Sequence, residues 1–350
     1  MANDKWTELN RFRLLGRSGL RVSPLCLGTM TFGPEWGWGC DKEESQKIFN
    51  YYVDRGGNFI DTANFYTGGT SETYLGDFMA SKRDQLVLAT KYTLNMRPGD
   101  PNGGGNHRKS MIQSLEASLK RLKTDYIDLY WVHMWDQLTP IDEVMRGLDD
   151  LIRSGKVLYI GISDMPAWMI AKANTLAELK SWTPFIGLQI EYSLIERTIE
   201  REFIALAKEL GMGITPWSPL AGGILTGKYQ PEAPPLDESL PNRKDFLANR
   251  LVERNFAIVK EVQRIAESIG RTPSQVSINW LFQRDGVISP IIGARRLDQL
   301  EDNLGALDFT LSQEDMGKLD DVSQIELGFP HDFLSIPMIK DHMSGGTKIE

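Results

Sequence analysis

The chain has 350 residues, of which 41% are hydrophobic and 25% charged, so it can bury a large core without disulfides or a structural metal. Its net charge of −8 argues against nucleic-acid binding, which depends on Lys and Arg contacts to phosphate, although a local basic cluster could still bind a small anion. The two cysteines, Cys26 and Cys40, allow no disulfide framework or Cys-rich metal site, and we expect a cytoplasmic protein because no signal-peptide core or 18-residue apolar stretch is found.

The first predicted element is a β-hairpin near the N-terminus. Residues 12–15 and 20–22 are short extended runs on either side of Gly16-Arg17-Ser18-Gly19, a sequence typical of a turn. A hairpin of this size suits the bottom of a closed barrel, and we expect it to cover that end.

Eight short runs rich in β-branched residues follow, separated by roughly thirty residues each, with helical periodicity in the gaps. This alternation predicts parallel βαβ units, and eight of them predict an α/β fold of the (β/α)8 TIM-barrel type rather than an open sheet. The predicted strands are residues 25–31, 58–62, 86–92, 126–133, 157–163, 186–192, 213–217 and 287–293.

The helical segments between the strands carry recognisable ends. Apolar residues recur at helical spacing over residues 111–122 and 141–152, for example. Gly56, Gly155 and Gly211 each follow such a segment, and we expect each glycine to adopt the left-handed conformation just after its helix.

The seventh gap is much longer than the others. It holds a loop, residues 221–249, and two helical patterns, residues 251–268 and 273–283. No domain boundary is needed, so we predict one domain over residues 1–350, with the barrel at about 22–325 and a C-terminal tail at 326–350.

Polar and aromatic residues stand at the ends of seven successive predicted strands. In a barrel enzyme the active site lies at the C-terminal ends of the strands, so these side chains are predicted to converge on one rim. They are Asp61 with Tyr66, Lys91, His133, Ser163 with Asp164, Gln189 with Tyr192, Trp217 with Ser218, and Gly293 with Arg295.

Four of these residues suggest proton transfer to a carbonyl oxygen. A tyrosine with a pKa near 10 is a poor acid, but a nearby ammonium lowers that pKa, and a carboxylate can hold the ammonium in place. Tyr66, Lys91 and Asp61 supply that arrangement. His133 could then orient a carbonyl oxygen beside the phenol.

Each of the four residues also has a structural interpretation. Asp61 could be a buried hydrogen-bonding residue, and Tyr66 an aromatic side chain on the rim. Lys91 could be a solvated strand end, and His133 a satisfied core histidine. Their common position at the ends of consecutive strands favours the catalytic interpretation.

The segment 57–63 (Gly-Asn-Phe-Ile-Asp-Thr-Ala), followed by Tyr66, Ser71-Glu72 and Leu75-Gly76, resembles the signature of the aldo-keto reductases, and the similarity extends over nearly the whole chain. The resemblance implies a (β/α)8 barrel, NADPH as cofactor, and a catalytic tetrad with Tyr66 as general acid. The tetrad consists of Asp61, Tyr66, Lys91 and His133. Trp131, Trp135-Asp136 and residues 163–168 resemble the aryl-alcohol dehydrogenase branch.

The resemblance also implies a set of cofactor contacts. They are Ser163, Asp164 and Gln189 at the nicotinamide carboxamide; Trp217 stacked on the ring; Ser218, Leu220, Gly222 and Lys228 at the pyrophosphate; Gly293, Arg295, Gln299 and Asn303 at the adenosine end; and Thr29. Asp164 departs from the family, because many members have Asn there, and its carboxylate cannot donate a hydrogen bond to the carboxamide.

The choice of NADPH over NADH is predicted from Arg295-Arg296, which directly precede a helical pattern at residues 297–304. A helix N-terminus with an adjacent guanidinium is a favourable anion site, and Arg can bind a 2′-phosphate through two hydrogen bonds. The alternative is that one or both arginines are solvated charges at the helix start.

Three other classes of protein were weighed. Residues 222–228 fit the phosphate-loop spacing G-x-x-x-x-G-K, but Tyr229 replaces the Mg²⁺-binding Ser or Thr and a Pro-rich segment follows, so an NTPase is disfavoured. The histidines show no metal-ligand spacing, and we expect no metal. Potassium-channel β subunits share the expected fold and cofactor but typically carry Asn at the position of His133, which favours an enzyme here.

The substrate is expected to be a small carbonyl compound or alcohol, and the sequence does not indicate an oligomeric state. Specificity would come from loops at residues 33–41, 94–106 and 134–138 and from the segment 328–350. Their aromatic residues could form an apolar pocket or pack between loops. These residues are Trp36, Trp38, Trp135, Phe329 and Phe333. Aryl aldehydes, quinones and bulky ketones are the candidates.

Overall fold

Residues 9–229, 247 and 249–347 are described by a computed structural model, in which eight parallel strands lie in the order β10–β3–β4–β5–β6–β7–β8–β9. The strands are β3 (Cys26–Gly28), β4 (Phe59–Asp61), β5 (Val87–Tyr92), β6 (Ile127–Val132), β7 (Val157–Ser163), β8 (Gly187–Gln189), β9 (Gly213–Ile214) and β10 (Ile291–Gly293). Each strand lies within one of the eight predicted runs, which confirms the prediction, and all except β7 are shorter than predicted.

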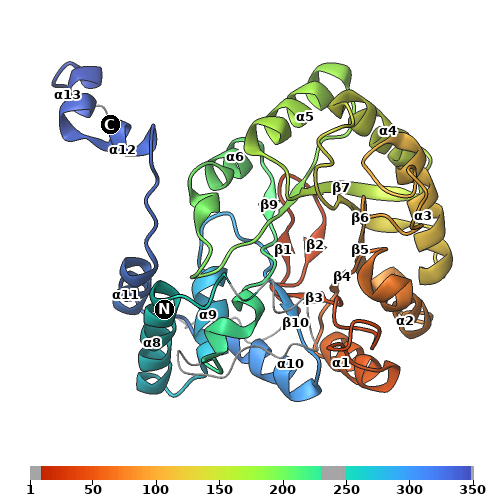
Figure 1. Ribbon diagram of the computed structural model, residues 1–350, viewed down its shortest axis with the longest axis horizontal. Coiled ribbons are helices and arrows are strands. Elements are labelled where there is room, and N and C mark those ends of the chain that lie inside the picture. The colour runs from red at the N-terminus through yellow and green to blue at the C-terminus, as the bar shows by residue number, and fades with distance from the viewer. Residues whose placement is uncertain (1–8, 230–246, 248, 348–350) are drawn as a thin grey trace.

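The two ends of the sheet meet between β9 and the segment leading to β10. Ile214 forms an isolated parallel bridge with Val287, and the amide of Ile288 donates to the carbonyl of Ile214 at 2.8 Å. The amide of Ile291 donates to the carbonyl of Pro216 at 2.8 Å. The sheet is therefore curled into the predicted (β/α)8 barrel, and Figure 1 shows the helices arranged around it.

The helices cover the outside of the strands (Figure 1). They are α1 (Lys42–Asp54), α2 (Thr70–Phe78), α3 (Arg108–Leu122), α4 (Ile141–Arg153), α5 (Ala167–Lys180), α6 (Phe203–Glu209), α8 (Glu253–Ser268), α9 (Pro273–Phe282), α10 (Leu297–Leu304), α11 (Gln313–Ser323), α12 (His331–Ser335) and α13 (Pro337–Ser344). Short 3-10 helices are η1 (Tyr66–Gly69), η2 (Arg83–Gln85), η3 (Thr198–Glu200), η4 (Ala221–Thr226) and η5 (Gly305–Leu307). Most of the loop predicted over residues 221–249 lies outside the described residues.

Local sequence signals account for several helix ends. Gly56, Gly155 and Gly211 have φ angles of +86°, +75° and +64°, as predicted for glycines that follow a helix. The start of α9 is fixed by Thr272, whose side chain accepts a hydrogen bond from the amide of Gln275 in a capping box. The three glycines lie between a helix and the next strand, so they set where the loops at the N-terminal end of the barrel, opposite the mouth, begin.

The barrel interior is filled by its own cluster of apolar side chains, which includes Trp131 from β6. A Cβ atom at Gly161 would lie 2.2 Å from the ring of Trp131, so only glycine leaves room for the indole. Leu15, fully buried, joins this cluster from the hairpin of β1 (Arg13–Leu14) and β2 (Arg21–Val22). The amide of Arg17 donates to the carbonyl of Gly211 at 2.6 Å, so the hairpin covers the N-terminal end of the barrel, as expected.

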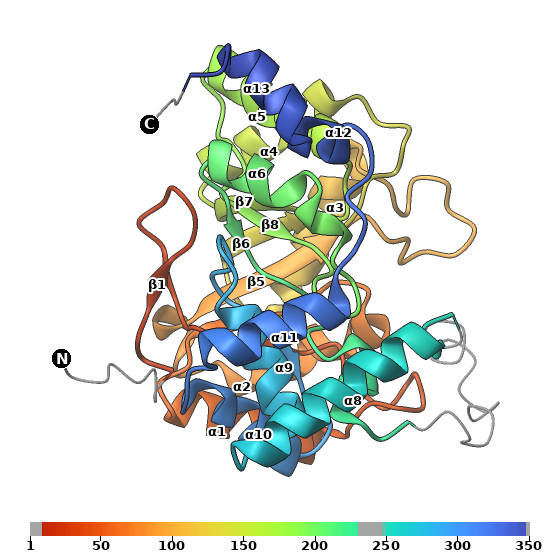
Figure 2. The ribbon, with the colours of Figure 1, turned by 90° about the vertical axis from the view of Figure 1, so that its left-hand side faces the viewer.

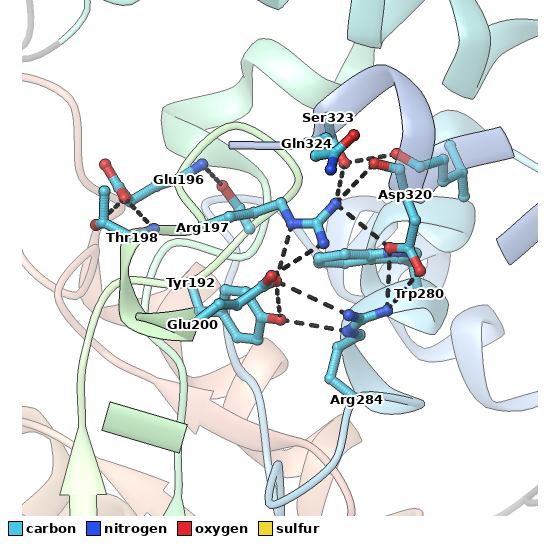
Figure 3. A network of polar contacts seen from close by, with 12 residues as sticks. Tyr192, Glu196, Arg197, Thr198, Glu200, Trp280, Arg284, Asp320, Ser323 and Gln324 are labelled. Carbon is cyan, nitrogen blue, oxygen red and sulfur yellow. Dashed lines mark hydrogen bonds and ion pairs between the residues drawn. The ribbon is translucent and has the colours of Figure 1, made fainter. Parts of the chain in front are cut away.

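A network of arginines and carboxylates joins the loop after β8 to α9 and α11 (Figure 3). The buried Arg197 donates to Glu200 at 2.8 Å and to the Ser323 hydroxyl at 2.6 Å, and Arg284 extends from α9 to the same group. Tyr192 donates its hydroxyl to Glu200 at 2.6 Å. The prediction that Tyr192 contributes to the catalytic rim is therefore wrong, because a buried ion-pair network binds its hydroxyl instead.

The C-terminal tail leaves the barrel. Figures 1 and 2 show α12 and α13 beyond the ring of helices, joined to α11 by an extended stretch. At the root of the tail, Arg254 donates to the carbonyl of Ser323 and Arg201 to that of Glu326, both at 2.8 Å. These contacts fix the chain on the side wall and direct it outward. Phe329 is 85% exposed and packs on Phe333 in this projecting tail, which argues against the alternative in which these two rings line a substrate pocket.

Candidate active site

Four side chains predicted from the sequence meet at the C-terminal ends of three neighbouring strands. Asp61 ends β4, Tyr66 begins η1 just beyond it, Lys91 lies in β5, and His133 directly follows β6. Because β4, β5 and β6 pair in parallel register, their ends lie at the same rim of the barrel. The order of the strands alone therefore gathers the four residues.

The fully buried Lys91 ammonium is the centre of this group. Its Nζ atom donates to a carboxylate oxygen of Asp61, to the carbonyl of Thr62 at 2.8 Å and to the hydroxyl of Tyr66 at 3.2 Å. Burial alone would lower the pKa of Lys91, but attraction to Asp61 and then to Tyr66 outweighs burial and leaves the pKa raised. Lys91 is therefore a fixed positive charge beside the phenol.

Burial dominates the ionisation of Tyr66. The pKa of Tyr66 is raised above its usual value, mainly because burial penalises the phenolate; the positive charge of Lys91 opposes this, and Asp61 adds to it. Lys91 lowers this pKa, as expected, but desolvation is the larger effect and the net shift is upward. Tyr66 is a protonated phenol at neutral pH.

His133 stands next to Tyr66 as a neutral imidazole. The two rings are 5.9 Å apart between centroids and almost perpendicular, at 82°. Burial, followed by the charge of Lys91, lowers the pKa of His133 to about 3. Within the described residues its buried Nδ1 atom has no hydrogen-bond partner. The imidazole therefore carries no charge at physiological pH.

A second layer of hydrogen bonds supports the tetrad. Gln189 donates to the second carboxylate oxygen of Asp61 at 2.9 Å. Thr29 is fully buried; its hydroxyl donates to the carbonyl of Asp61 at 3.0 Å and accepts from Ser71 at 2.9 Å. Gln189 and Thr29, both predicted as cofactor residues, thus also hold Asp61. The sequence reasoning assigned no role to the hydroxyl of Ser71, although Ser71 lies in the signature motif.

Ser163 and Asp164 follow one another at the end of β7, and Asp164 is paired with Trp217 after β9. The indole Nε1 of Trp217 donates to a carboxylate oxygen of Asp164 at 3.1 Å. Asp164 has a φ angle of +41°, a conformation that Asp tolerates better than most residues. The half-buried indole also packs on the barrel-interior cluster. Strands β7 and β9 are separated by β8 in the sheet, and both side chains stand at the same rim.

The loop after Trp217 has the backbone of an anion cradle. Ser218 has a φ angle of +56°, and its hydroxyl accepts a hydrogen bond from the amide of Gly222 at 3.2 Å. Leu220 lies between these two residues in the loop. Gly222 and Gly223 have φ angles of +67° and +92°, and a Cβ atom at Gly223 would lie 2.7 Å from the Lys228 ammonium. A side chain there would block the cation. Successive amides in such conformations form concavities that suit phosphate.

The remaining predicted cofactor residues lie around the end of β10. The amide of Arg295 donates to the Gln299 side chain at 2.9 Å, and the Asn303 side chain donates to the carbonyl of Gly293 at 3.4 Å. Gly293 is exposed, with open space where a Cβ would stand. The four residues predicted at the adenosine end thus form two hydrogen-bonded pairs.

The N-terminus of α10 differs from the expectation of an open anion site. The amide of Leu297 donates to the carboxylate of Glu44 from α1, at 2.8 Å. Arg296 pairs with Asp298 on the surface, as the structural interpretation of that residue predicts. The first helical amide therefore already has an anionic partner, and the Arg295 guanidinium donates to the carbonyl of Trp38 at 3.4 Å.

Aromatic side chains border the mouth beside Tyr66. Trp36 lies 6.2 Å from the Tyr66 ring, edge to face at 78°, and it also contacts Trp38 and Phe65 at 5.5 and 5.9 Å. On another part of the rim, Trp135 packs edge to face on the exposed Trp168 at 6.0 Å. Phe65 was not predicted to lie at the mouth, although an aromatic residue directly before Tyr66 in the sequence could have indicated this position.

The fold and the site agree with the protein family whose sequence model the chain matches. The family model described as the aldo/keto reductase family matches residues 24–324. The chain therefore belongs to the aldo/keto reductase family and is an oxidoreductase. In the described part of the chain, no helix is both long and apolar enough to cross a membrane.

Three relatives show which branch of the family the chain resembles. It is 40% identical over 342 residues to an aryl-alcohol dehydrogenase [NADP(+)] of Phanerodontia chrysosporium, with 93% of this chain and 89% of the relative covered. It is 38% identical to a norsolorinic acid reductase of Aspergillus flavus, with 94% and 85% covered. An aryl-alcohol dehydrogenase of Pestalotiopsis microspora is also 38% identical, with 93% and 85% covered. The chain thus falls in the aryl-alcohol-dehydrogenase-like branch.

Proposed function

We propose that the protein catalyses the reversible, NADPH-dependent reduction of aldehydes or ketones to alcohols, with Tyr66 as proton donor. The observation that carries the proposal is the position of the Lys91 ammonium. It donates hydrogen bonds to both the Asp61 carboxylate and the Tyr66 hydroxyl, beside the neutral His133. A phenol, an ammonium and a neutral imidazole around one point supply a proton and hydrogen bonds to a developing alkoxide.

Each side chain has one role in this mechanism. The raised pKa keeps Tyr66 protonated until a carbonyl oxygen accumulates negative charge and takes the proton. Lys91 stabilises the resulting phenolate, and Asp61 keeps the ammonium charged and oriented. His133, uncharged, donates a hydrogen bond to the same oxygen and fixes its direction.

The residues at the mouth fit a nicotinamide dinucleotide. Trp217 offers a flat, half-exposed face, the Gly222–Gly223 turn with Lys228 offers amides and a cation for the pyrophosphate, and Arg295 offers a guanidinium for a 2′-phosphate. When bound, the nicotinamide supplies the hydride for reduction of the substrate carbon or accepts it in the reverse direction. The name of one relative includes NADP(+), which supports the phosphorylated form.

The substrate is proposed to be an aromatic carbonyl compound or the corresponding alcohol. Trp36 and Phe65 border the space above Tyr66, and aromatic rings favour edge-to-face and offset contacts with other rings. Relatives are named for aryl alcohols and for norsolorinic acid, which agrees with such a substrate.

The test is NADPH oxidation by the purified protein with aryl aldehydes, ketones and quinones, compared with that of Tyr66→Phe. The substitution removes one oxygen, so folding and NADPH affinity should be unchanged while turnover falls on the order of a hundredfold or more. Thr67→Ser, which changes a neighbouring buried residue conservatively, serves as the control. Near-wild-type turnover of an unactivated aldehyde by Tyr66→Phe would rule out the proposed acid.

A further inference from the structure

The Asp164 carboxylate is a negative charge at the mouth that the proposed proton transfer does not use. Within the described residues it forms no salt bridge, and the side-chain hydrogen bond that it accepts comes from the neutral indole of Trp217. The carbonyl of Asp164 accepts from the amide of Trp135 at 3.3 Å, so the backbone that carries the carboxylate is tied to the loop after His133. Asp164 is exposed, but a ligand over Trp217 would cover it.

The charged groups around Asp164 do not neutralise it. Lys91 lies within electrostatic reach but already bonds Asp61. Glu191 adds a second negative charge and is itself paired with Arg250. Desolvation by the surrounding protein raises the pKa of Asp164 to about 6. The hydrogen bond from Trp217 lowers this pKa, the charge of Glu191 raises it further, and the charge of Lys91 lowers it. Asp164 is therefore mostly ionised at neutral pH.

The position of Asp164 relative to the tetrad determines what its charge acts on. Asp164 directly follows β7, at the same rim of the barrel as the ends of β4, β5 and β6 that carry the tetrad. A hydride donor must be adjacent to the carbonyl that the tetrad protonates. The space that the nicotinamide ring needs is thus bordered by Asp164, by Trp217 and by Tyr66.

We propose that Asp164 stabilises the oxidised, positively charged nicotinamide over the reduced, neutral one, and so biases the bound cofactor toward NADP⁺. This inference rests on the proposed function. The carboxylate attracts a ring that carries a positive charge and has no comparable attraction to a neutral ring. An Asn at this position, as in many aldo-keto reductases, would offer a similar shape without the charge.

The size of the effect follows from Coulomb's law. At a partly exposed site the effective dielectric constant lies between that of protein and that of water. Opposite unit charges about 6 Å apart at such a site change a binding constant roughly fivefold. Because the carboxylate is charged above its pKa of about 6 and neutral below it, the preference for NADP⁺ is present above pH 6 and is lost as the pH falls through 6. It also weakens as salt is added.

The experiment measures the dissociation constants of NADP⁺ and NADPH by calorimetry at pH 8 and pH 5, for the wild type, Asp164→Asn and Asp164→Glu. The quantity compared is the ratio of the NADPH constant to the NADP⁺ constant. The 2′-phosphate also titrates near pH 6, but it is common to both nucleotides and cancels in the ratio. Asp142→Asn, which removes an exposed carboxylate from α4, controls for net charge.

In the wild type the ratio should fall roughly fivefold between pH 8 and pH 5. Asp164→Asn should show, at both pH values, the low ratio that the wild type shows at pH 5. Asp164→Glu and Asp142→Asn should keep the pH dependence of the wild type. If both nucleotides bind but the ratio is independent of pH in the wild type, or unchanged in Asp164→Asn at pH 8, this inference is overturned and the proposed function stands. If the wild type binds neither nucleotide, the proposed function itself fails, and this inference with it.

Discussion

Burial controls the protonation of the side chains that meet beside Lys91. It raises the pKa of Tyr66 against the pull of the ammonium and lowers the pKa of His133 to about 3. The phenol is therefore protonated and the imidazole neutral at the same pH, which gives one proton donor and one uncharged hydrogen-bond donor. Charge proximity alone, which is all that the sequence suggests, predicts the opposite shift for Tyr66.

The neutral His133 should make the fold sensitive to acid. An unfolded histidine has a pKa near 6.5, so below that pH the unfolded chain binds a proton that folded His133 does not, and the free energy of unfolding falls. The expected loss from this residue between pH 7 and pH 5 is about 1–2 kcal/mol. Urea unfolding of the wild type and His133→Gln at both pH values tests this. Equal losses in the two proteins would mean that the folded imidazole protonates freely.

At the scale of elements, the contact between α1 and α10 bears on which nucleotide binds. Glu44 accepts a hydrogen bond from the first amide of α10, close to Arg295. A carboxylate at this place satisfies the helix N-terminus but repels an incoming phosphate, whereas a guanidinium attracts it. The balance between Glu44 and Arg295 should therefore set the preference for NADPH over NADH.

Glu44→Gln keeps an acceptor for the Leu297 amide and removes the charge. We expect NADPH to bind severalfold more tightly, on the order of threefold at low salt, with NADH unchanged. Arg295→Ala should do the reverse and weaken NADPH by roughly 1.5–3 kcal/mol. Nucleotide titrations measure both, and Glu43→Gln, whose side chain is 80% exposed on the same helix, is the control. Equal changes for both nucleotides would argue against a role at the 2′-phosphate.

At the scale of the whole molecule, the barrel and its tail are separate in packing. The tail root is held by Arg254 and Arg201, and beyond it α12 and α13 project from the side wall (Figures 1 and 2). The aromatic residues of the tail therefore lie away from the barrel, and the aromatic wall at the mouth comes from the loops after β3, β4 and β6.

Deleting residues 328–350 should leave the barrel intact, because the deletion keeps Ser323 and Glu326, which the two arginines bind. We expect the unfolding temperature and the KM for an aryl aldehyde to be unchanged. As a comparison, Trp36→Ala should raise that KM, because it removes the ring that faces Tyr66. A large rise in KM on deletion of the tail would show that the segment 328–350 contributes to substrate specificity, as expected from the sequence.

The sequence by itself determined the elements and the residues that could converge. The eight apolar runs, the helical periodicity and the glycines after helices predict the barrel because they depend only on local spacing and backbone preference. The tetrad follows from them, since its members end consecutive strands that pair in order.

Only the tertiary structure decided how those residues ionise and what else they contact. The pKa shifts of Tyr66 and His133 depend on how completely neighbouring elements exclude water, and no local pattern encodes that. The bond between Trp217 and Asp164, and that between Glu44 and α10, join segments 53 and 253 residues apart, and Arg197 ties the root of the tail to the side wall. Such contacts depend on how the strands and helices pack in three dimensions, because residues far apart in the chain become neighbours only when the whole chain folds.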